Sequence, residues 1–294
     1  LIEELEAHIH PQAQMKVISA LQQEEGVQFI LTTHSPNITS KVKLGKDNDV
    51  NSILMCNSNN VFPLGSGYTK LVKKDYKYLD TFLDVTKSNL FFAKGVILVE
   101  GWAEEILIPV IALKMGIDLT QHEVSVVNVG STAYLHFARI FMRQEAPEMD
   151  VKCAIVTDLD VKPDTANKAQ VEKEKRDSID GKLGKPLPTN ITLCLAKEWT
   201  LEWCLVKSPV LAELFKDSVA VVHSKTTEFK KDATMHRYKD SFETKLYEKL
   251  KNRTLNKTAI ALILSEKIEE STLDFNQQDE YIKYLLDSIK FVVS

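Results

Sequence analysis

Two short apolar runs, each ending in carboxylates, constrain the fold of this chain more than any other feature of its sequence. The first run is GVILVEG (residues 95–101), which ends at Glu100, and the second is AIVTDLD (residues 154–160), which ends at Asp158 and Asp160. Short continuous apolar runs bounded by turn signals are typical of strands that are buried on both faces of a parallel sheet. The two runs therefore predict two inner strands with acidic side chains at their carboxyl ends.

The segment between the two runs has the alternation of elements that a parallel sheet requires. Residues 102–115 have the apolar spacing of a helix, residues 124–129 resemble a strand, and residues 133–142 resemble a second helix. The predicted order is thus βαβαβ, and the predicted fold class is α/β with a mostly parallel sheet and flanking helices. The polar residues that do chemistry in such sheets collect at the carboxyl ends of the strands.

The carboxylates expected at this edge of the sheet would repel one another unless a cation or a proton neutralised them. Glu104 follows Glu100 by one helical turn, so a helix that starts near Gly101 would bring it to the same opening. A cluster of oxygen ligands suits Mg²⁺ or Mn²⁺ better than zinc. The residues alone therefore predict a site for a divalent cation.

The same motifs resemble the Toprim domain that topoisomerases, primases and certain nucleases share. The resemblance rests on VEG followed by Glu104, and on DLD after a second strand. Upstream, IEELEAHIHPQ (2–12) and TTHSP (32–36) resemble the end of an ABC-type ATPase. An ATPase followed by a Toprim domain is the architecture of the overcoming-lysogenization-defect (OLD) family of nucleases. The chain resembles this family over nearly its whole length.

The resemblance implies roles for three residues of the ATPase remnant. Glu3 takes the position of the Mg²⁺-binding acid, Glu4 that of the acid that activates the attacking water, and His34 that of the switch histidine near the γ-phosphate. No phosphate-binding G-x-x-x-x-G-K-[ST] loop occurs, so this chain is not expected to hydrolyse ATP. ATP is expected as a cofactor of a longer parent protein, which would form a homodimer through its ATPase portion.

The resemblance also implies the full set of residues at the nuclease site. TLE (200–202) resembles the OLD segment that supplies a further carboxylate, which selects Glu202, with Glu198 as a second choice. The alternative is that Glu202 lies on the exposed side of a helix. NKTAIA (256–261) resembles the element whose lysine faces the metals, so Lys257 would stabilise charge on the scissile phosphate. Two cations, Mg²⁺ or Mn²⁺, would be shared by Glu100, Glu104, Asp158, Asp160 and Glu202.

A basic segment, residues 223–257, could supply a contact with DNA. It holds ten Lys or Arg against five Asp or Glu, and aromatic residues are interleaved with the basic ones. Such a cationic segment would attract a polyanion that the carboxylates repel. The alternative is a surface helix whose aromatic side chains lie in the core. The candidate DNA-binding residues are Lys230, Lys231, Arg237, Lys251 and Arg253.

Four regions are expected along the chain. Residues 1–74 would be the ATPase remnant, with a helix from Pro11 to about Glu25, a strand over 27–33 and a final hairpin of strands 51–57 and 61–64. Residues 75–92 would be a linker helix, with helical spacing over 76–92. Residues 93–206 would form the Toprim core, with a polar insertion at 161–188 that would be a mobile loop or an exposed helix. A turn at Ser131 and Thr132 would cap a helix or meet a phosphate. Residues 207–294 would be helical and would complete the nuclease site. Because the chain begins at a strand end, we expect it to be part of a longer protein.

The composition is that of an ordinary globular protein, with 294 residues, 44% hydrophobic residues and a formal net charge of −4. Any surface that binds nucleic acid would therefore have to be local. No apolar run approaches the roughly 18 residues that span a bilayer, and no leader opens the chain. A cytoplasmic location without a membrane partner follows as the default. The four cysteines lack C-x-x-C spacing and are expected to be reduced thiols.

The predicted function is metal-dependent endonuclease action on DNA by the two-metal route. One alternative is a topoisomerase-like strand transferase, which uses the same acids but needs a tyrosine nucleophile to hold the cut end. Eight tyrosines are present, and the sequence singles out none of them. A second alternative is a non-catalytic DNA-binding or assembly module beside a recombination or defence ATPase.

Overall fold

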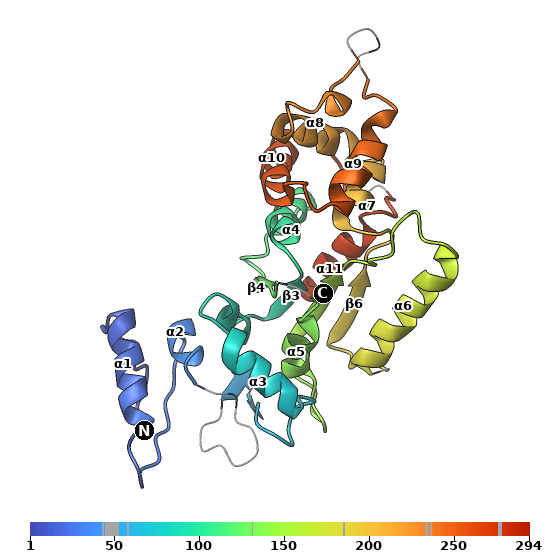
Figure 1. Cartoon of the computed structure of the whole chain (residues 1–294). Coiled ribbons are helices and arrows are strands. Elements are labelled where there is room, and N and C mark those ends of the chain that lie inside the picture. Colours follow the sequence, from blue (N-terminus) through green and yellow to red (C-terminus); the bar gives the residue numbers. More distant parts are fainter. Residues whose placement is uncertain are drawn as a thin grey trace.

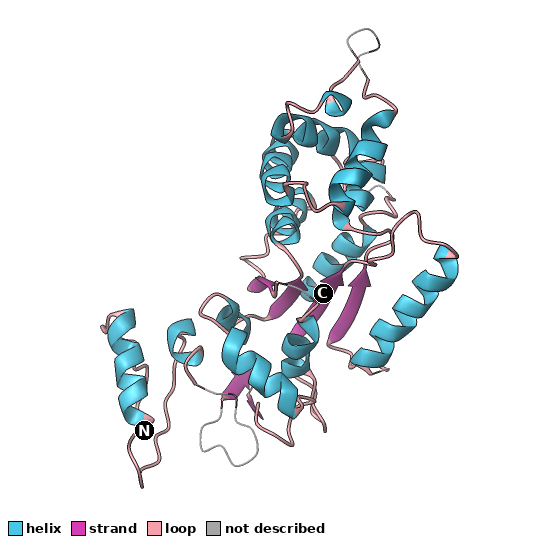
Figure 2. Cartoon of the chain, viewed as in Figure 1, coloured by secondary structure: helices cyan, strands magenta, loops and turns pink. Residues whose placement is uncertain are grey.

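A four-stranded parallel sheet forms the centre of the protein (Figures 1 and 2). The computed structural model describes residues 1–42, 44, 53–57, 59–130, 132–184, 186–232, 235, 237–275 and 278–294. The strand order is β4-β3-β5-β6. The strands are β3 (Gly95–Val99), β4 (Val124–Asn128), β5 (Lys152–Thr157) and β6 (Ile191–Leu195). The predicted α/β class and its parallel sheet are confirmed.

The register of the sheet brings the carboxyl ends of its strands together. Val99 pairs with Asn128 on one side of β3, and Leu98 pairs with Ile155 on the other. All five residues of β3 are buried, which is why its sequence is apolar throughout rather than alternating. The polar residues that follow β3 and β5 therefore emerge at the same edge.

Helices cover both faces of the sheet. On one face lie α4 (Trp102–Lys114) and the helices of the C-terminal portion, and their side chains share one core cluster with Ile97, Ala154 and Val156. The C-terminal portion comprises α7 (Leu201–Lys207), α8 (Ala212–Val222), α9 (Ser241–Lys251), α10 (Lys257–Glu270) and α11 (Lys283–Val293). Figure 1 shows α8, α9 and α10 extending away from the sheet, whereas α11 lies against its strands.

The helix α11 lies directly against β3 because residue 95 is a glycine. A Cβ atom at Gly95 would come within 2.9 Å of the Val292 carbonyl oxygen and 3.0 Å of the Val124 side chain. Any larger residue would push α11 or β4 away from the sheet. Gly95 thus allows the last helix to close the face from which the site residues of α7 and α10 approach.

The other face of the sheet is covered by elements from both sides of the predicted domain boundary. They share a second core cluster, which includes Leu79, Phe137 and Ile155. The elements are β1 (Leu54–Asn57), β2 (Asn60–Pro63), α3 (Lys73–Phe82), η1 (Lys87–Phe91), α5 (Tyr134–Ala138) and η2 (Arg139–Phe141). The predicted hairpin is the antiparallel pair β1-β2, and the hairpin residues 51, 52 and 58 lie outside the described residues.

The N-terminal elements are shorter than the sequence predicts. The helix α1 (Pro11–Leu21) ends before residue 25, and the short α2 (Pro36–Thr39) follows it. The strand expected at 27–33 is reduced to one parallel bridge between Ile2 and Leu31. Val27 and Ile30 remain exposed, so little packing supports a strand that extends beyond this bridge.

The helix predicted over 76–92 is broken in two by Asp84. Its carboxylate accepts hydrogen bonds from the Thr86 hydroxyl (2.6 Å) and the Lys87 backbone N–H (3.0 Å), which starts η1 as a separate turn. Local bonding of this kind competes with the continuation of a helix. The polar insertion contains one exposed helix, α6 (Lys168–Leu183), which was one of the two predicted forms. No described helix is both long and apolar enough to cross a bilayer.

A buried ion-pair network joins α3 to the helices beside the sheet. The carboxylate of Asp75 is fully buried and accepts hydrogen bonds from Arg139 Nη1 at 3.0 and 3.1 Å and from the Val72 backbone N–H at 2.8 Å. His136 Nδ1 lies 2.6 Å from the same carboxylate. Arg139 also donates to the carbonyl of Lys182 in α6 at 3.1 Å. Removing the charge of Asp75 would leave Arg139 without its counter-ion.

We expect Asp75→Asn to lower the free energy of unfolding by about 3 kcal/mol, because it breaks a buried ion pair while keeping the side-chain shape. Urea denaturation followed by circular dichroism measures the change. The matched control is Asp177→Asn on the exposed face of α6, which should change the stability by less than about 0.5 kcal/mol. Equal effects of the two substitutions would show that the network does not stabilise the fold.

Candidate active site

Five predicted site residues converge at the carboxyl edge of the sheet. Glu100 follows β3 and Asp158 follows β5, while Glu104 and Glu202 lie in the first turns of α4 and α7. Lys257 is the first residue of α10. The charges of Glu100, Glu104, Glu202 and Lys257 all act on Asp158, which therefore lies centrally among them.

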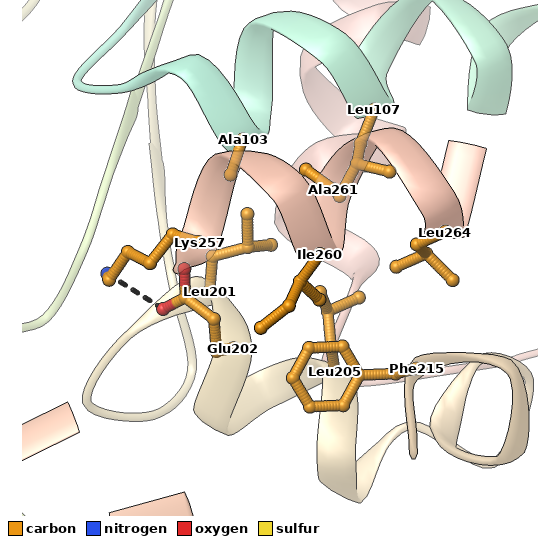
Figure 3. Close-up of a pocket in the computed structure, with 10 residues that line it drawn as sticks. All are labelled: Ala103, Leu107, Leu201, Glu202, Leu205, Phe215, Lys257, Ile260, Ala261 and Leu264. Carbon is orange, nitrogen blue, oxygen red and sulfur yellow. Dashed lines mark ion pairs between the residues drawn. The ribbon is translucent and has the colours of Figure 1, made fainter. Parts of the chain in front are cut away.

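The Glu104 and Glu202 carboxylates of this cluster lie inside the protein, whereas its lysine is about half exposed. The Glu202 and Lys257 side chains are 3% and 46% exposed, and their ion pair is 2.8 Å long. Figure 3 shows the two side chains pointing toward one another from α7 and α10. Glu104 is also buried, whereas Glu100 and Asp158 are partly exposed. The predicted alternative of an exposed Glu202 is wrong.

Local sequence explains how Glu104 and Glu202 reach the interior. A Cβ atom on Gly101 would lie 3.1 Å from Glu104 Oε2, so the glycine after Glu100 makes room for the Glu104 carboxylate. Thr200 caps α7 by accepting a hydrogen bond from the Trp203 backbone N–H at 3.3 Å. Both glutamates then lie in the first turn of a helix, where the helix dipole favours a negative charge.

Three carboxyl groups of the cluster, those of Glu100, Glu104 and Asp158, have raised pKa values. Burial, followed by the charge of Glu202, raises the pKa of Glu104 to about 7. Burial and the charges of Glu104 and Glu202 raise the pKa of Asp158 well above its usual range. Burial also raises the pKa of Glu100, although the Thr157 hydrogen bond opposes it. The cluster therefore favours protons or another source of positive charge.

Lys257 supplies part of that positive charge. Burial alone would lower the pKa of its ammonium, but the charges of Glu202, Asp158 and Glu104 outweigh burial and raise the pKa. Lys257 therefore stays protonated at neutral pH. Its single charge faces four carboxyl groups, so it cannot neutralise them all.

Asp160 and Glu198 do not belong to the buried group. Asp160 is exposed, forms a 3.5 Å ion pair with Lys175 of α6, and influences the cluster through Glu100. Glu198 pairs instead with Lys168 at 2.9 Å and Lys207 at 3.4 Å. Burial opposes the charge of Glu198, yet these lysines lower its pKa overall. Of the two candidates for the further carboxylate, only Glu202 lies in the cluster.

Three residues beside the cluster were not predicted from the sequence. The Thr157 hydroxyl donates a short hydrogen bond to Glu100 Oε1, and the Tyr134 hydroxyl is hydrogen-bonded to Thr157 in turn. Lys175 pairs with Asp160. Thr157 directly precedes Asp158 at the end of β5, so strand register could have indicated it. No local signal marks Tyr134 or Lys175, which come from other elements. Ser131 lies outside the described residues.

The chemistry of this donor set fits a divalent cation. Glu202 Oε1 is buried without a hydrogen-bond partner in the structure, and like charges crowd around Asp158. Hard cations prefer such carboxylate oxygens. Among the described residues, however, no three acidic, histidine or cysteine side chains already converge as a metal-binding group. Cation binding would therefore require the carboxylates to turn toward one another.

A small cavity lies behind the Glu202–Lys257 pair. It measures about 10 Å³ and is lined mainly by apolar side chains, among them Leu107, Phe215 and Ile260 (Figure 3). This volume holds roughly one water molecule. The cavity is therefore too small for a substrate. The apolar side chains that line it form the inner wall of the site.

The basic segment lies on η3 (Thr227–Phe229), the following turn and α9. Its aromatic residues Phe229 and Phe242 are buried in the core, as the alternative to DNA contact predicted. Lys231 pairs with Asp217 at 2.9 Å and Lys251 with Asp164 at 3.2 Å. Lys230, Arg237 and Arg253 are exposed. Lys251 links the end of α9 to the loop after Asp160, so this end of the segment borders the acidic cluster.

The predicted ATPase residues lie together at the N-terminus. The bridge between Ile2 and Leu31 brings Glu3 and Glu4 beside the segment that carries His34. Glu6, which was not predicted, ties the two segments by accepting hydrogen bonds from the His34 backbone N–H (2.6 Å) and the Thr33 hydroxyl (2.8 Å). Glu3, Glu4 and His34 themselves are exposed.

The parallel sheet with acidic side chains at its carboxyl edge is the α/β arrangement that is predicted for a Toprim domain. Residues 91–160 match the family described as "Overcoming lysogenization defect protein-like, TOPRIM domain". Residues 1–40 match the family described as "AAA domain, putative AbiEii toxin, Type IV TA system". The chain is therefore similar to OLD-like Toprim domains over residues 91–160 and to AAA domains over residues 1–40.

One curated relative is the endonuclease GajA of Bacillus cereus (strain HuB5-5), which is 27% identical over 193 residues. The match covers 57% of this chain and 27% of GajA, so the chain spans about a quarter of that relative. Two solved structures are also similar. The C-terminal region of the Xanthomonas campestris pv. campestris OLD protein is 18% identical, with a TM-score of 0.42, over 70% of this chain and 94% of that one. The C-terminal region of the Burkholderia pseudomallei OLD protein is 19% identical, with a TM-score of 0.43, over 69% and 100%.

The stability of the metal-free protein should fall as the pH rises through about 7. The pKa of Glu104 is raised from 4.5 to about 7 by burial, so folding favours its protonated form. That contribution is complete below pH 4.5 and is lost as the pH passes the folded pKa, a change on the order of 2–3 kcal/mol. Thermal unfolding in EDTA between pH 5 and 8 measures it.

The variant Glu104→Gln should flatten this pH dependence, because it removes the titrating group and keeps the shape. Glu174→Gln, on the exposed part of α6, controls for the loss of one carboxylate elsewhere. Mg²⁺ should raise the unfolding temperature more at pH 8 than at pH 5.5, because it competes with protons for the same oxygens. A pH dependence that is the same in all three proteins would contradict the assignment to Glu104.

Proposed function

We propose that this chain is the catalytic region of a metal-dependent DNA endonuclease. The observation that carries the proposal is the group of buried carboxylates around the Glu202–Lys257 pair. A buried cluster of like charges costs stability and is expected at functional sites rather than in structural cores. The similarity to the endonuclease GajA supports the same activity.

In the proposed site, Glu100, Glu104, Asp158 and Glu202 hold divalent cations, with Asp160 at the exposed rim. Bound Mg²⁺ or Mn²⁺, two ions in the proposed arrangement, would supply Lewis-acid stabilisation of phosphate charge and a water of lowered pKa. Lys257 places its ammonium beside these carboxylates and at the surface, where it can meet the scissile phosphate. A positive charge aimed at a developing negative one stabilises the transition state.

Other residues of the chain hold this arrangement in place. Thr157 orients Glu100 through its hydrogen bond to Oε1. The apolar wall behind Glu202 leaves room for about one water molecule, and a site with so little water strengthens each electrostatic interaction. The candidate DNA-binding residues Lys230, Arg237 and Arg253 are exposed and would contact phosphates outside the site. Lys231 and Lys251 would contact DNA phosphates only after leaving their present carboxylate partners, Asp217 and Asp164.

The regions outside the site have a proposed role in a longer protein. Residues 1–74 would be the end of an ATPase domain, with Glu3, Glu4 and His34 at its nucleotide site. The helical segment at 75–92 would connect this domain to the Toprim core at 93–206, and residues 207–294 would complete the nuclease site. In that protein ATP would bind to the ATPase portion, through which two copies would pair.

A strand-transferase activity is less well supported than hydrolysis. Of the eight tyrosines, Tyr134 lies beside Glu100 and Thr157. Burial and the charges of Glu100 and Asp160 raise the pKa of its phenol, which disfavours the phenolate that would attack a phosphate. A covalent protein–DNA adduct would overturn this preference.

Cleavage of supercoiled plasmid DNA tests the proposal directly. The wild-type chain should nick or linearise the plasmid with Mg²⁺ or Mn²⁺ and leave it intact in EDTA. Asp158→Asn should reduce the rate at least about 100-fold, and Lys257→Met should reduce it by roughly 100-fold, because each removes charge at the reacting phosphate. The product ratio on an agarose gel gives the rates.

Two measurements make the result specific to the site. Lys283→Met, an exposed lysine of α11 that pairs with Asp287, controls for the loss of a positive charge and should keep wild-type activity. Calorimetry with Mn²⁺ should show binding to the wild type and none to Asp158→Asn. Intact plasmid under every condition, with DNA binding retained, would favour the non-catalytic assembly module.

A further inference from the structure

One exposed tryptophan, Trp102, lies next to the acidic cluster. Trp102 is 63% exposed, more than every other large hydrophobic residue in the described part of the chain except the terminal Leu1. No ring contact or cation–π contact of the described residues involves it. The other two tryptophans, Trp199 and Trp203, are buried and contact the ring of Tyr247 in tilted and edge-on arrangements. Exposing the apolar surface of an indole ring to water is unfavourable, and an exposed ring of this kind indicates a binding site.

The position of Trp102 ties it to the proposed nuclease site. It is the first residue of α4, two residues after Glu100 and two before Glu104. Two residues are at most about 7 Å along the chain. In a helix, positions two apart point to nearly opposite sides, so the burial of Glu104 directs Trp102 outward. The ring therefore lies on the solvent side of the turn that presents both glutamates.

The side of α4 that carries Trp102 faces the β4 edge of the sheet. Glu105, one helical turn from Trp102, accepts a hydrogen bond at 3.0 Å from Asn128, the last residue of β4. Lys175, Asp160 and the end of α9 lie at the opposite side, beyond β5. A DNA strand crossing the carboxyl edge of the sheet would thus meet Trp102 on one side of Asp158 and basic groups on the other.

An uncharged ring is the kind of contact that DNA can make beside a group of carboxylates. The acids repel phosphates at this side of the site, whereas the face of a base is uncharged and stacks on indole. We propose that the Trp102 ring stacks on an unpaired nucleobase adjacent to the scissile phosphate. This proposal rests on the proposed nuclease function. Inside a duplex both faces of each base are covered by neighbours. The ligand is therefore single-stranded DNA, or the frayed end of a duplex.

Tryptophan fluorescence tests the stacking directly, because Trp102 is the exposed tryptophan of three. Titration with a 12-nucleotide oligothymidylate, in EDTA and again with Ca²⁺, should quench the emission and protect it from iodide. An oligomer of the same length with abasic sites should do neither. Closed hairpin DNA without a single-stranded end should quench much less than the oligothymidylate at equal concentration.

Two substitutions at residue 102 separate stacking from other causes of quenching. Trp102→Phe should abolish the quench while fluorescence anisotropy of labelled oligothymidylate shows nearly unchanged binding, because phenylalanine still stacks. Trp102→Ala should raise the Kd about tenfold. Leu113→Ala is the matched control, since Leu113 is 56% exposed on the same helix, roughly 16 Å away along the helix axis, and it should leave the Kd unchanged.

The outcomes distinguish this proposal from the proposed nuclease activity. Plasmid cleavage that depends on Asp158, together with no base-dependent quench, would overturn the stacking role and leave the nuclease intact. A base-dependent quench without any cleavage would keep the stacking role and overturn the nuclease. An emission shift that depends only on protein concentration, and that DNA does not alter, would show that Trp102 contacts a second copy of the chain instead.

Discussion

Repulsion among buried carboxylates, opposed by one lysine, is the interaction around which this protein is arranged. Glu104, Asp158 and Glu202 come from three separate elements, and Lys257 from a fourth. Each lies at the end of a strand or in the first turn of a helix. A single ammonium at the surface cannot balance this much buried negative charge. The remaining negative charge favours the binding of cations at this edge of the sheet.

The two faces of the sheet have different tasks in this arrangement. The face toward the C-terminal helices delivers Glu202 and Lys257, which are far from β3 and β5 in sequence, to the strand ends. The opposite face is packed against α3 and the hairpin. The buried Asp75–Arg139 ion pair holds α3 to the helical segment beside this face.

The sequence predicted correctly the features that depend on local patterns, and it was wrong where the structure depends on contacts between distant residues or on side-chain hydrogen bonds. The strand containing residues 95–99 was predictable because both of its faces are buried, so every position is apolar. The strand predicted at 27–33 was wrong in extent, because strand length depends on neighbours that pack on it, and residues such as Ile30 have none. The continuous helix predicted over 76–92 was wrong, because the Asp84 carboxylate accepts a hydrogen bond from the nearby Lys87 backbone N–H and starts a new turn there.

The sequence by itself determined the parallel sheet, its order of elements and the presence of Glu100, Asp158 and Asp160 at one edge. These features follow from local apolar runs and from the geometry that all parallel strands share. Only the tertiary structure decided that Asp160 faces Lys175 rather than the cluster, that Thr157 and Tyr134 support Glu100, and that Trp102 is exposed. These depend on contacts between residues distant in sequence and on which side of a helix is covered, and no local pattern encodes either.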